Sequence, residues 1–165
     1  MLTRIIVFSW FFLKNNSKYK FFSSSKKITE KIIFLGTGTS QGIPVIASNH
    51  PVCKSNDPRD KRLRVSILIS WKEYNFVIDC GPDFRYQMLR EKVENIRAIL
   101  FTHEHRDHVA GLDDVRSFNW VNKSAVDIYA ETRVINCLKS MFSYAFREID
   151  RYPGAPSINV NIINE

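Results

Sequence analysis

Thr102-His103-Glu104-His105-Arg106-Asp107-His108 directly follows the apolar run Ala98-Ile99-Leu100-Phe101. Three of the four histidines in the chain therefore lie within six residues. Imidazole and carboxylate groups are common protein ligands of zinc, iron and manganese. Polar side chains at the end of a buried strand are costly to desolvate without partners, and a bound metal removes that cost. The H-x-H-x-D-H spacing therefore predicts a metal site.

The spacing also predicts how the ligands are divided. If residues 98–101 form a buried strand, His103 and His105 project to the same side, because side chains alternate along an extended chain. Asp107 and His108 follow where the chain turns off the strand. This arrangement favours two metal ions, one held by the histidine pair and one by the Asp–His pair.

The ligand set of the cluster is incomplete for two metals. A catalytic zinc has about three protein ligands, so two ions need roughly six. The fourth histidine, His50, lies far upstream, and no histidine follows His108. The sequence therefore predicts open coordination positions, borrowed ligands or an incomplete site.

Length and charge indicate one domain, residues 30–165, preceded by a different segment, residues 1–29. The chain has 165 residues and a formal charge of +7. Residues 1–29 hold six of the 24 basic residues and no acidic one, which leaves 18 basic against 17 acidic residues in the domain. A near-neutral domain lacks the basic footprint of a nucleic-acid-binding protein, so we expect no nucleic-acid partner.

Residues 1–29 form a basic and apolar extension. The apolar run at 5–13 is too short to span a bilayer, and no small-residue cleavage site follows it. A targeting or membrane-surface role stays open, but a start codon placed too far upstream is the preferred interpretation. The chain has no C-x-x-C pair, which favours reduced thiols and a cytoplasmic protein without stable membrane insertion. Its three cysteines are Cys53, Cys80 and Cys137.

A layered α/β domain is expected from the order of its elements. Apolar and β-branched runs predict strands at 31–35, 65–70, 75–79, 98–101, 127–130 and 157–163, with a hairpin at 71–74. Apolar periodicity predicts helices at 84–93 and 132–146, with Asp83 as a candidate N-cap and a loop or short helix at 109–119. The glycine-rich segment 36–42 matches no nucleotide-binding fingerprint, so a tight loop lining a site is expected there. Residues 43–61, which contain three prolines, are expected to form a loop.

Several motifs occur in one order along the chain. They are Gly36-Thr37-Gly38-Thr39-Ser40, Pro51-Val52-Cys53, Asp57-Pro58-Arg59-Asp60-Lys61-Arg62, Val77-Ile78-Asp79-Cys80-Gly81-Pro82-Asp83-Phe84-Arg85, the histidine cluster and Gly111-Leu112-Asp113-Asp114. On these motifs, the chain from Lys31 onward resembles the metallo-β-lactamase-fold hydrolase superfamily. The resemblance is to the phosphodiesterase branch that includes phosphoribosyl cyclic phosphate phosphodiesterase.

The resemblance implies an αβ/βα sandwich with a two-metal site at the edge of its sheets. It implies that His103 and His105 bind the first metal, and Asp107 and His108 the second. Zinc is the preferred ion, with manganese and iron as alternatives. The implied reaction is hydrolysis of a small phosphodiester by a two-metal-activated hydroxide, which Asp107 would orient. Asp79 is implied to orient a ligand, although a turn or helix-entry role is equally open from the sequence. Asp107 and Asp79 are therefore the candidate catalytic residues.

The chain also departs from the family pattern. The family completes its site with a later His, a bridging Asp and a final His, none of which can be assigned here. A full domain runs to roughly 200–250 residues, so we expect the N-terminal half of the fold plus the start of the second sheet. Some relatives hold a further zinc near Pro51-Val52-Cys53. His50 and Cys53 cannot close such a site alone, so a surface histidine and a small buried cysteine are preferred.

Three functions follow from the sequence. The first is a metal-dependent phosphodiesterase. The second is a tRNA 3′-processing endoribonuclease-like hydrolase, which the near-neutral domain disfavours because such an enzyme must hold a polyanion. The third is a catalytically inactive, truncated fragment, whose open strand edges predict poor solubility and leave a homodimer open.

Overall fold

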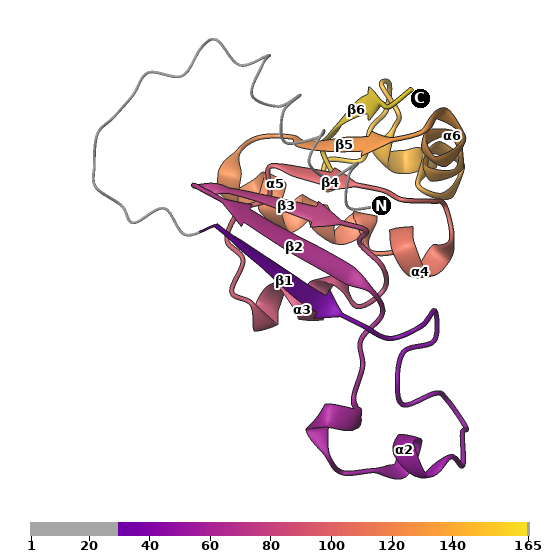
Figure 1. The fold of residues 1–165 in the computed structure, drawn as a ribbon. Coiled ribbons are helices and arrows are strands. Elements are labelled where there is room, and N and C mark those ends of the chain that lie inside the picture. Colours follow the sequence, from indigo (N-terminus) through magenta and orange to yellow (C-terminus); the bar gives the residue numbers. More distant parts are fainter. Residues whose placement is uncertain (1–29, 165) are drawn as a thin grey trace.

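The computed structural model describes residues 30–164, which form one six-stranded sheet with helices packed against it (Figure 1). The expectations for residues 1–29 lie outside the described part of the chain. The strands are β1 (Lys31–Gly36), β2 (Ser66–Trp71), β3 (Tyr74–Ile78), β4 (Ala98–Leu100), β5 (Val126–Ala130) and β6 (Ile158–Ile162). They follow one another across the sheet in chain order.

The sheet changes from antiparallel to parallel at its centre. Strands β1, β2 and β3 form an antiparallel meander, and β3, β4, β5 and β6 run parallel. The predicted hairpin joins β2 to β3, with Trp71 opposite Tyr74 and Lys72 at a φ of 56°. Parallel strands need long crossovers, and each parallel crossover of this chain contains at least one helix. The predicted α/β class is confirmed.

The last strand does not begin a second sheet. We expected residues 157–163 to start one, but β6 pairs in parallel with β5 from Val126–Ile158 to Ala130–Ile162. A strand-forming pattern specifies an extended segment but not its partner. Here the helical crossover returns the chain to the free edge of β5, which a β-strand–helix–β-strand connection favours.

The helices are shorter than their periodicity predicted. They are α2 (Pro51–Lys54), α3 (Phe84–Arg90), α4 (Arg106–Val109), α5 (Arg116–Asn122) and α6 (Thr132–Met141), with 3₁₀ turns η1 (Pro58–Asp60), η2 (Leu112–Val115) and η3 (Ser143–Ala145). The helix expected at 132–146 ends at Met141, because Phe142 leaves the helical region with φ −120° and ψ 42°. No helix within residues 30–164 is long and apolar enough to cross a membrane.

The hydrophobic core lies between the sheet and the helical elements α3, η2, α5 and α6, and α3 and α5 cover one face of the sheet (Figure 1). Phe84 of α3 and Phe118 of α5 meet edge to face, with ring centroids 6.3 Å apart. Burial of each large apolar side chain contributes about 1.5–3 kcal/mol. Every sheet strand before β6 contributes a residue to this core: Leu35, Leu68, Val77, Ile99 and Ile128.

The opposite face of the sheet is open at β1. Ile32 and Phe34 point away from the helices, and they are 63% and 65% exposed. No helix of residues 30–164 covers β1 and β2 on this side (Figure 1). The described residues therefore form one helix-covered sheet layer, which is consistent with part of a layered sandwich.

Asp83 does not cap α3 as predicted. Its side chain makes no capping hydrogen bond. Its two oxygens instead accept hydrogen bonds from the backbone N–H and Nη1 of Arg64, at 2.8 and 3.0 Å. The sequence pattern indicated the helix start correctly, but the nearby arginine takes the carboxylate.

The glycine-rich segment packs tightly against residues 62–64. A Cβ atom on Gly36 would lie 2.0 Å from the carbonyl oxygen of Arg64, and one on Gly38 would lie 2.8 Å from that of Leu63. These glycines are therefore required by close backbone approach. The expectation that this segment lines a site stays a prediction.

Candidate metal centre

The candidate site lies where parallel strands end. Asp79 follows β3, and the histidine cluster follows β4. The backbone N–H of Asp79 donates to the carbonyl of Leu100 at 2.9 Å, and that of Phe101 donates to Tyr129 at 2.9 Å. These two hydrogen bonds extend the pairing of β3 with β4 and of β4 with β5 by one residue. The carboxyl ends of neighbouring parallel strands lie along one edge, so the topology places chemically active side chains together there.

Asp79 is held in a left-handed conformation and is almost fully buried. Its φ is 60°, and its exposure is 4%. A non-glycine residue in this region costs roughly 1–2 kcal/mol, which the surrounding contacts must offset. Its carboxylate accepts three hydrogen bonds: from the N–H of Thr102 at 2.8 Å, the hydroxyl of Thr102 at 2.7 Å and Nδ1 of His108 at 2.8 Å. Asp79 is therefore hydrogen-bonded to Thr102 and His108 and is not the cap of α3, and its role in orienting a metal ligand stays a prediction.

The same network assigns the ring protons of two histidines. The hydroxyl of Thr102 donates to Asp79, so it accepts from Nδ1–H of His103, which is 3.0 Å away. Likewise, Nδ1–H of His108 donates to the acceptor-only carboxylate of Asp79. A neutral imidazole protonated at Nδ1 presents its lone pair at Nε2. Both rings thus present the tautomer that can bind a metal through Nε2.

The three histidine rings gather in one place. The His103 ring centroid is 4.7 Å from that of His105 and 4.0 Å from that of His108. Burial lowers the pKa of His103, and the neighbouring His108 and His105 lower it further. A lowered pKa favours the neutral ring, which is the form that binds metals. His105 is exposed at the start of α4 and makes no capping hydrogen bond, so its ring is not used by the helix.

Asp107 and His108 form a second pair of donor atoms. Oδ2 of Asp107 lies 3.2 Å from Nε2 of His108. Because Nδ1–H of His108 donates to Asp79, the lone pair of Nε2 faces the carboxylate oxygen of Asp107. Two electron-pair donors this close repel each other unless a proton or a metal cation lies between them. Two ligand atoms on one tetrahedral zinc, each at 2.0–2.1 Å, would lie about 3.3 Å apart. The pair therefore fits a shared metal ion.

Gly81 lets α4 approach the site. A Cβ atom on Gly81 would lie 1.9 Å from the carbonyl oxygen of Asp107, which is far below any real contact. Gly111 packs on the same turn, where its Cβ would lie 2.4 Å from the carbonyl oxygen of Gly81. The two glycines therefore fix where Asp107 and His108 stand relative to Asp79.

The described residues still do not close a metal site. Within residues 30–164, no group of three or more His, Cys, Asp or Glu side chains is placed to hold a metal ion. The division of the four donors into two pairs stays a prediction, and either pair alone would be short of the three or four ligands that zinc takes. The structure brings the four predicted ligands together, and their coordination of a metal stays a prediction.

One contact at the cluster was not predicted from the sequence. Nη1 of Arg133, in the first turn of α6, lies 2.6 Å from both carboxylate oxygens of Glu104. Glu104 stands between His103 and His105 in the chain. No motif could have indicated Arg133, because the contact depends on α6 following β5 at the same edge of the sheet.

His50 and Cys53 lie away from the cluster, in the projecting segment that carries α2 (Figure 1). His50 is exposed, and its Nδ1 accepts a hydrogen bond from the N–H of Val52 at 3.3 Å. Cys53 is partly exposed and not buried as expected, because α2 is a single turn that buries no side chain. The cysteine accepts a bond from the N–H of Val45 at 3.5 Å.

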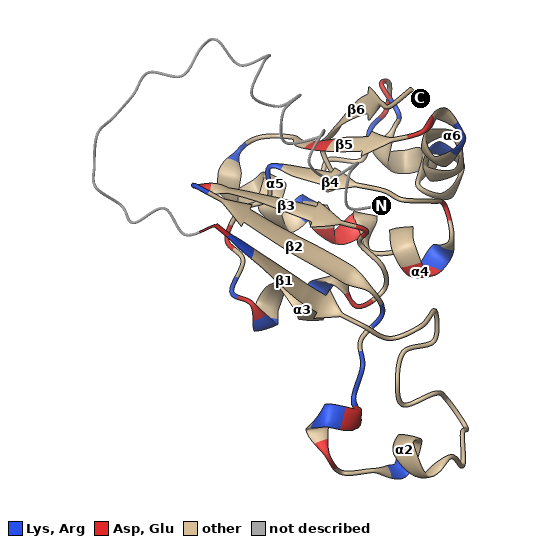
Figure 2. Ribbon diagram, in the orientation of Figure 1, with Lys and Arg blue, Asp and Glu red and all other residues tan. Residues whose placement is uncertain are grey.

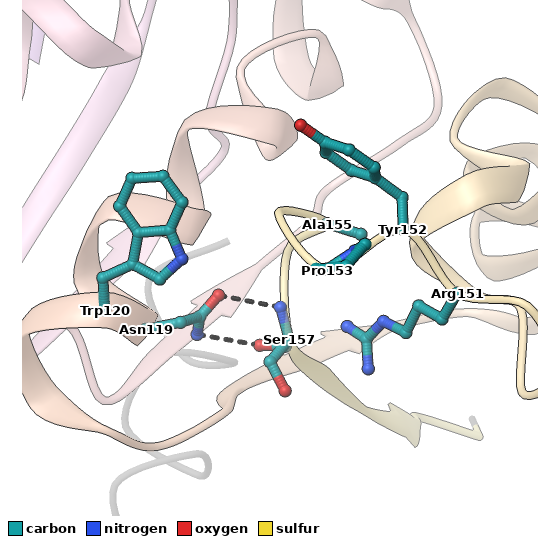
Figure 3. A pocket seen from close by; sticks show the side chains of 7 residues that line it. All are labelled: Asn119, Trp120, Arg151, Tyr152, Pro153, Ala155 and Ser157. Atoms are coloured by element: carbon teal, nitrogen blue, oxygen red, sulfur yellow. Dashed lines mark hydrogen bonds between the residues drawn. The ribbon is translucent and has the colours of Figure 1, made fainter.

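A hollow of about 250 Å³ lies near the start of β6 (Figure 3). Asn119 and Arg151, which line it, make hydrogen bonds within the protein. Asn119 donates to the carbonyl of Ser157 at 2.9 Å and accepts from its N–H at 2.8 Å, and Arg151 donates to the carbonyl of Pro156. Ser157 precedes β6, at the edge opposite the histidine cluster. The two hydrogen bonds between Asn119 and Ser157 therefore hold α5 against the start of β6.

Comparison with known families identifies the domain. The family described as "Beta-lactamase superfamily domain" matches residues 74–165, which is more than half of the chain and includes the histidine cluster. The chain belongs to the metallo-β-lactamase superfamily. This confirms the family that the motifs resembled.

Two curated proteins and two solved structures illustrate where the chain lies within the superfamily. An octanoyltransferase from Porphyromonas gingivalis is 43% identical over 131 residues, which is 79% of this chain but 26% of that protein. A ribonuclease Z from Clostridioides difficile is 31% identical over 93 residues, which is 54% of this chain and 30% of that protein. A diphosphatase of the PhnP family superposes with a TM-score of 0.72 at 37% identity, over 81% of this chain and 50% of that one. Zinc-bound PqqB from Methylobacterium extorquens has a TM-score of 0.63 at 21% identity, over 81% of this chain and 46% of that one, and shows the shared fold alone.

The chain spans half or less of the length of each of these proteins. This agrees with the expected partial sandwich of the superfamily. The metallo-β-lactamase fold of this chain is thus represented by one sheet layer in residues 30–164, and zinc is bound by a protein of the same fold.

Proposed function

We propose that this chain is part of a metal-dependent hydrolase that cleaves phosphodiester bonds in a small substrate. The observation that carries the proposal is the setting of His108. Its Nδ1 is bound to buried Asp79, and its Nε2 faces Oδ2 of Asp107. This arrangement directs a fixed imidazole lone pair and a carboxylate toward one point, as a metal site requires.

The roles of the residues follow from that setting. His103 and His105 would hold one divalent ion, and Asp107 and His108 the other, with zinc preferred over manganese or iron. Bound there, the two ions would lower the pKa of a water molecule and stabilise negative charge on phosphate oxygens. Asp107 would accept a hydrogen bond from the attacking water and so orient it toward phosphorus. Asp79 would keep His108 in the Nδ1-protonated tautomer.

Similarity to the PhnP-family diphosphatase supports hydrolysis at a phosphorus atom over other reactions of the fold, because 37% identity extends over most of this chain. The remaining half of the active site would have to come from residues beyond the described set. We therefore expect the 165-residue chain alone to show little or no turnover.

A tRNA 3′-processing endoribonuclease is the second candidate, and similarity to ribonuclease Z favours it. The charge distribution argues against it. Lys and Arg, like Asp and Glu, are spread over many of the described elements, and both signs occur together on the projecting segment that carries α2 (Figure 2). An enzyme that holds a polyanion depends on a surface where basic side chains gather.

The metal proposal is tested on the 165-residue chain by zinc competition with a chromogenic chelator. We expect binding that is lost in His105→Ala and retained in His50→Ala, because only the first residue belongs to the cluster. Equal zinc binding by wild type and His105→Ala would contradict the ligand assignment. Robust hydrolysis of a bis-aryl phosphodiester by this chain, lost in His105→Ala, would contradict the need for further ligands.

The substrate class is tested with a chimera. Residues 30–163 would replace the matching half of the PhnP-family diphosphatase, with zinc or manganese supplied. We expect hydrolysis of a bis-aryl phosphodiester that disappears in the His105→Ala chimera, and no cleavage of precursor tRNA. Cleavage of precursor tRNA in preference to the small diester would instead favour the second candidate.

A further inference from the structure

The segment between the two predicted ligands of the first metal is tied to α6 by one ion pair. Nη1 of Arg133 lies 2.6 Å from both Oε1 and Oε2 of Glu104. The side chains are 59% and 31% exposed, so solvent screens the pair and limits its contribution to stability. The significance of the contact therefore lies in what it positions.

Glu104 contacts Arg133, whereas the rings of its two histidine neighbours contact each other. His105 has an extended backbone with φ −61° and ψ 144°, and side chains alternate along an extended chain, so we expect His103 and His105 on one side and Glu104 on the other. The 4.7 Å separation of the two histidine ring centroids agrees with this arrangement. Holding the carboxylate of Glu104 on its own side therefore also fixes the direction of both imidazoles.

The position of Arg133 is unfavourable for its own helix. It lies in the first turn of α6, which contains no acidic residue. A positive side chain opposes the helix dipole at that end. Only Glu104 and, at 3.4 Å, Glu131 offset its charge in the described ion pairs. Helix formation does not account for an arginine here, whereas the contact with Glu104 does.

We propose that Arg133 is a positioning residue that holds the His103–Glu104–His105 segment in its metal-binding arrangement. The inference rests on the proposed metal site. Two residues would then hold the cluster from different sides. Buried Asp79 would orient His108, and exposed Arg133 would orient His103 and His105 through Glu104. Arg133 lies in α6, which follows β5, and it thus supports the His103–His105 pair, which follows the neighbouring strand β4.

The test compares variants of the 165-residue chain by zinc competition. We expect Arg133→Ala to lower zinc affinity about twofold to fivefold, in line with the strength of an exposed ion pair. Arg133→Lys, which keeps the charge, should recover most of the affinity. Arg59→Ala is the matched control, because it removes an ion pair of the same 2.6 Å length in the projecting segment. If Arg133 acts through Glu104, adding Arg133→Ala to Glu104→Gln should lower the affinity no further.

A measurement without metal separates the two proposals. We expect amide hydrogen exchange in residues 102–106 of the metal-free chain to accelerate in Arg133→Ala but not in Arg59→Ala. Unchanged exchange together with unchanged zinc affinity would overturn the role of Arg133 and leave the metal site intact. If the wild-type chain bound no zinc, the proposed function would fail, and the exchange comparison would still decide whether Arg133 holds the segment.

Discussion

The buried carboxylate of Asp79 accepts a hydrogen bond from Nδ1 of His108 at 2.8 Å, although the two residues are 29 positions apart in the chain. The contact joins the end of β3 to α4. It fixes both the tautomer and the direction of the imidazole. Asp79 makes this contact from a left-handed backbone conformation, with a φ of 60°.

Replacing Asp79 with Asn should weaken zinc binding by about 10–100-fold, which is typical for a residue that orients a metal ligand. The amide has one acceptor oxygen for three donors, so its NH₂ group must face either Thr102 or His108. Zinc competition measures the loss. Asp127→Asn is the control, because Asp127 is also buried but pairs with Arg97 on neighbouring strand ends. Equal affinities of Asp79→Asn and wild type would show that His108 is oriented by something else.

Gly81→Ala should lower the free energy of unfolding by about 1–3 kcal/mol, because the new methyl group overlaps the backbone of Asp107. Zinc affinity should fall with it, since α4 must shift. Urea unfolding and zinc competition measure the two effects. In Gly154→Ala the nearest atoms belong to the exposed ring of Tyr152, which can move, so little change is expected. Similar stability of the two variants would contradict the packing argument.

Cys53 should react with iodoacetamide before Cys80 does. A hydrogen bond with Ser48 and one from the N–H of Val45 lower the pKa of Cys53, whereas full burial raises the pKa of Cys80 well above its ordinary value. The thiolate is the reactive form, so alkylation of Cys53 should reach half its maximal rate at a lower pH than that of an unstructured cysteine. Cys80 should react only after unfolding. Peptide mass spectrometry across a pH series checks both, and early labelling of Cys80 would contradict its burial.

The double variant Ile32→Thr/Phe34→Thr should reduce self-association and change the free energy of unfolding by less than about 1 kcal/mol. Both side chains are largely exposed on the open face of β1, and threonine keeps the strand preference. Light scattering over a concentration series and urea unfolding provide the two readouts. Leu35→Thr is the control on the same strand, because Leu35 is fully buried and its loss should cost about 2 kcal/mol or more. Strong destabilisation by the double variant would show that this face is packed within the chain.

The sequence predicted the strands well, because apolar and β-branched runs bounded by turn residues carry a local signal. All six expected strands occur, with ends shifted by at most one residue. The helices were predicted less accurately. Asp83 had the chemistry of an N-cap, but Arg64 competes for its carboxylate, and no local pattern reveals that competition.

The sequence by itself determined the chemistry available to this protein: three imidazoles and the carboxylate of Asp107 within six residues, placed after a buried strand. Ligand type and spacing are local properties, so they can be predicted without a fold. The tertiary structure decided how those groups are held. It placed Asp79 beneath His108, Arg133 beside Glu104 and β6 in the same sheet as β5. Each of these contacts joins segments far apart in the chain, because parallel strands bring their carboxyl ends to one edge whatever the distance along the sequence.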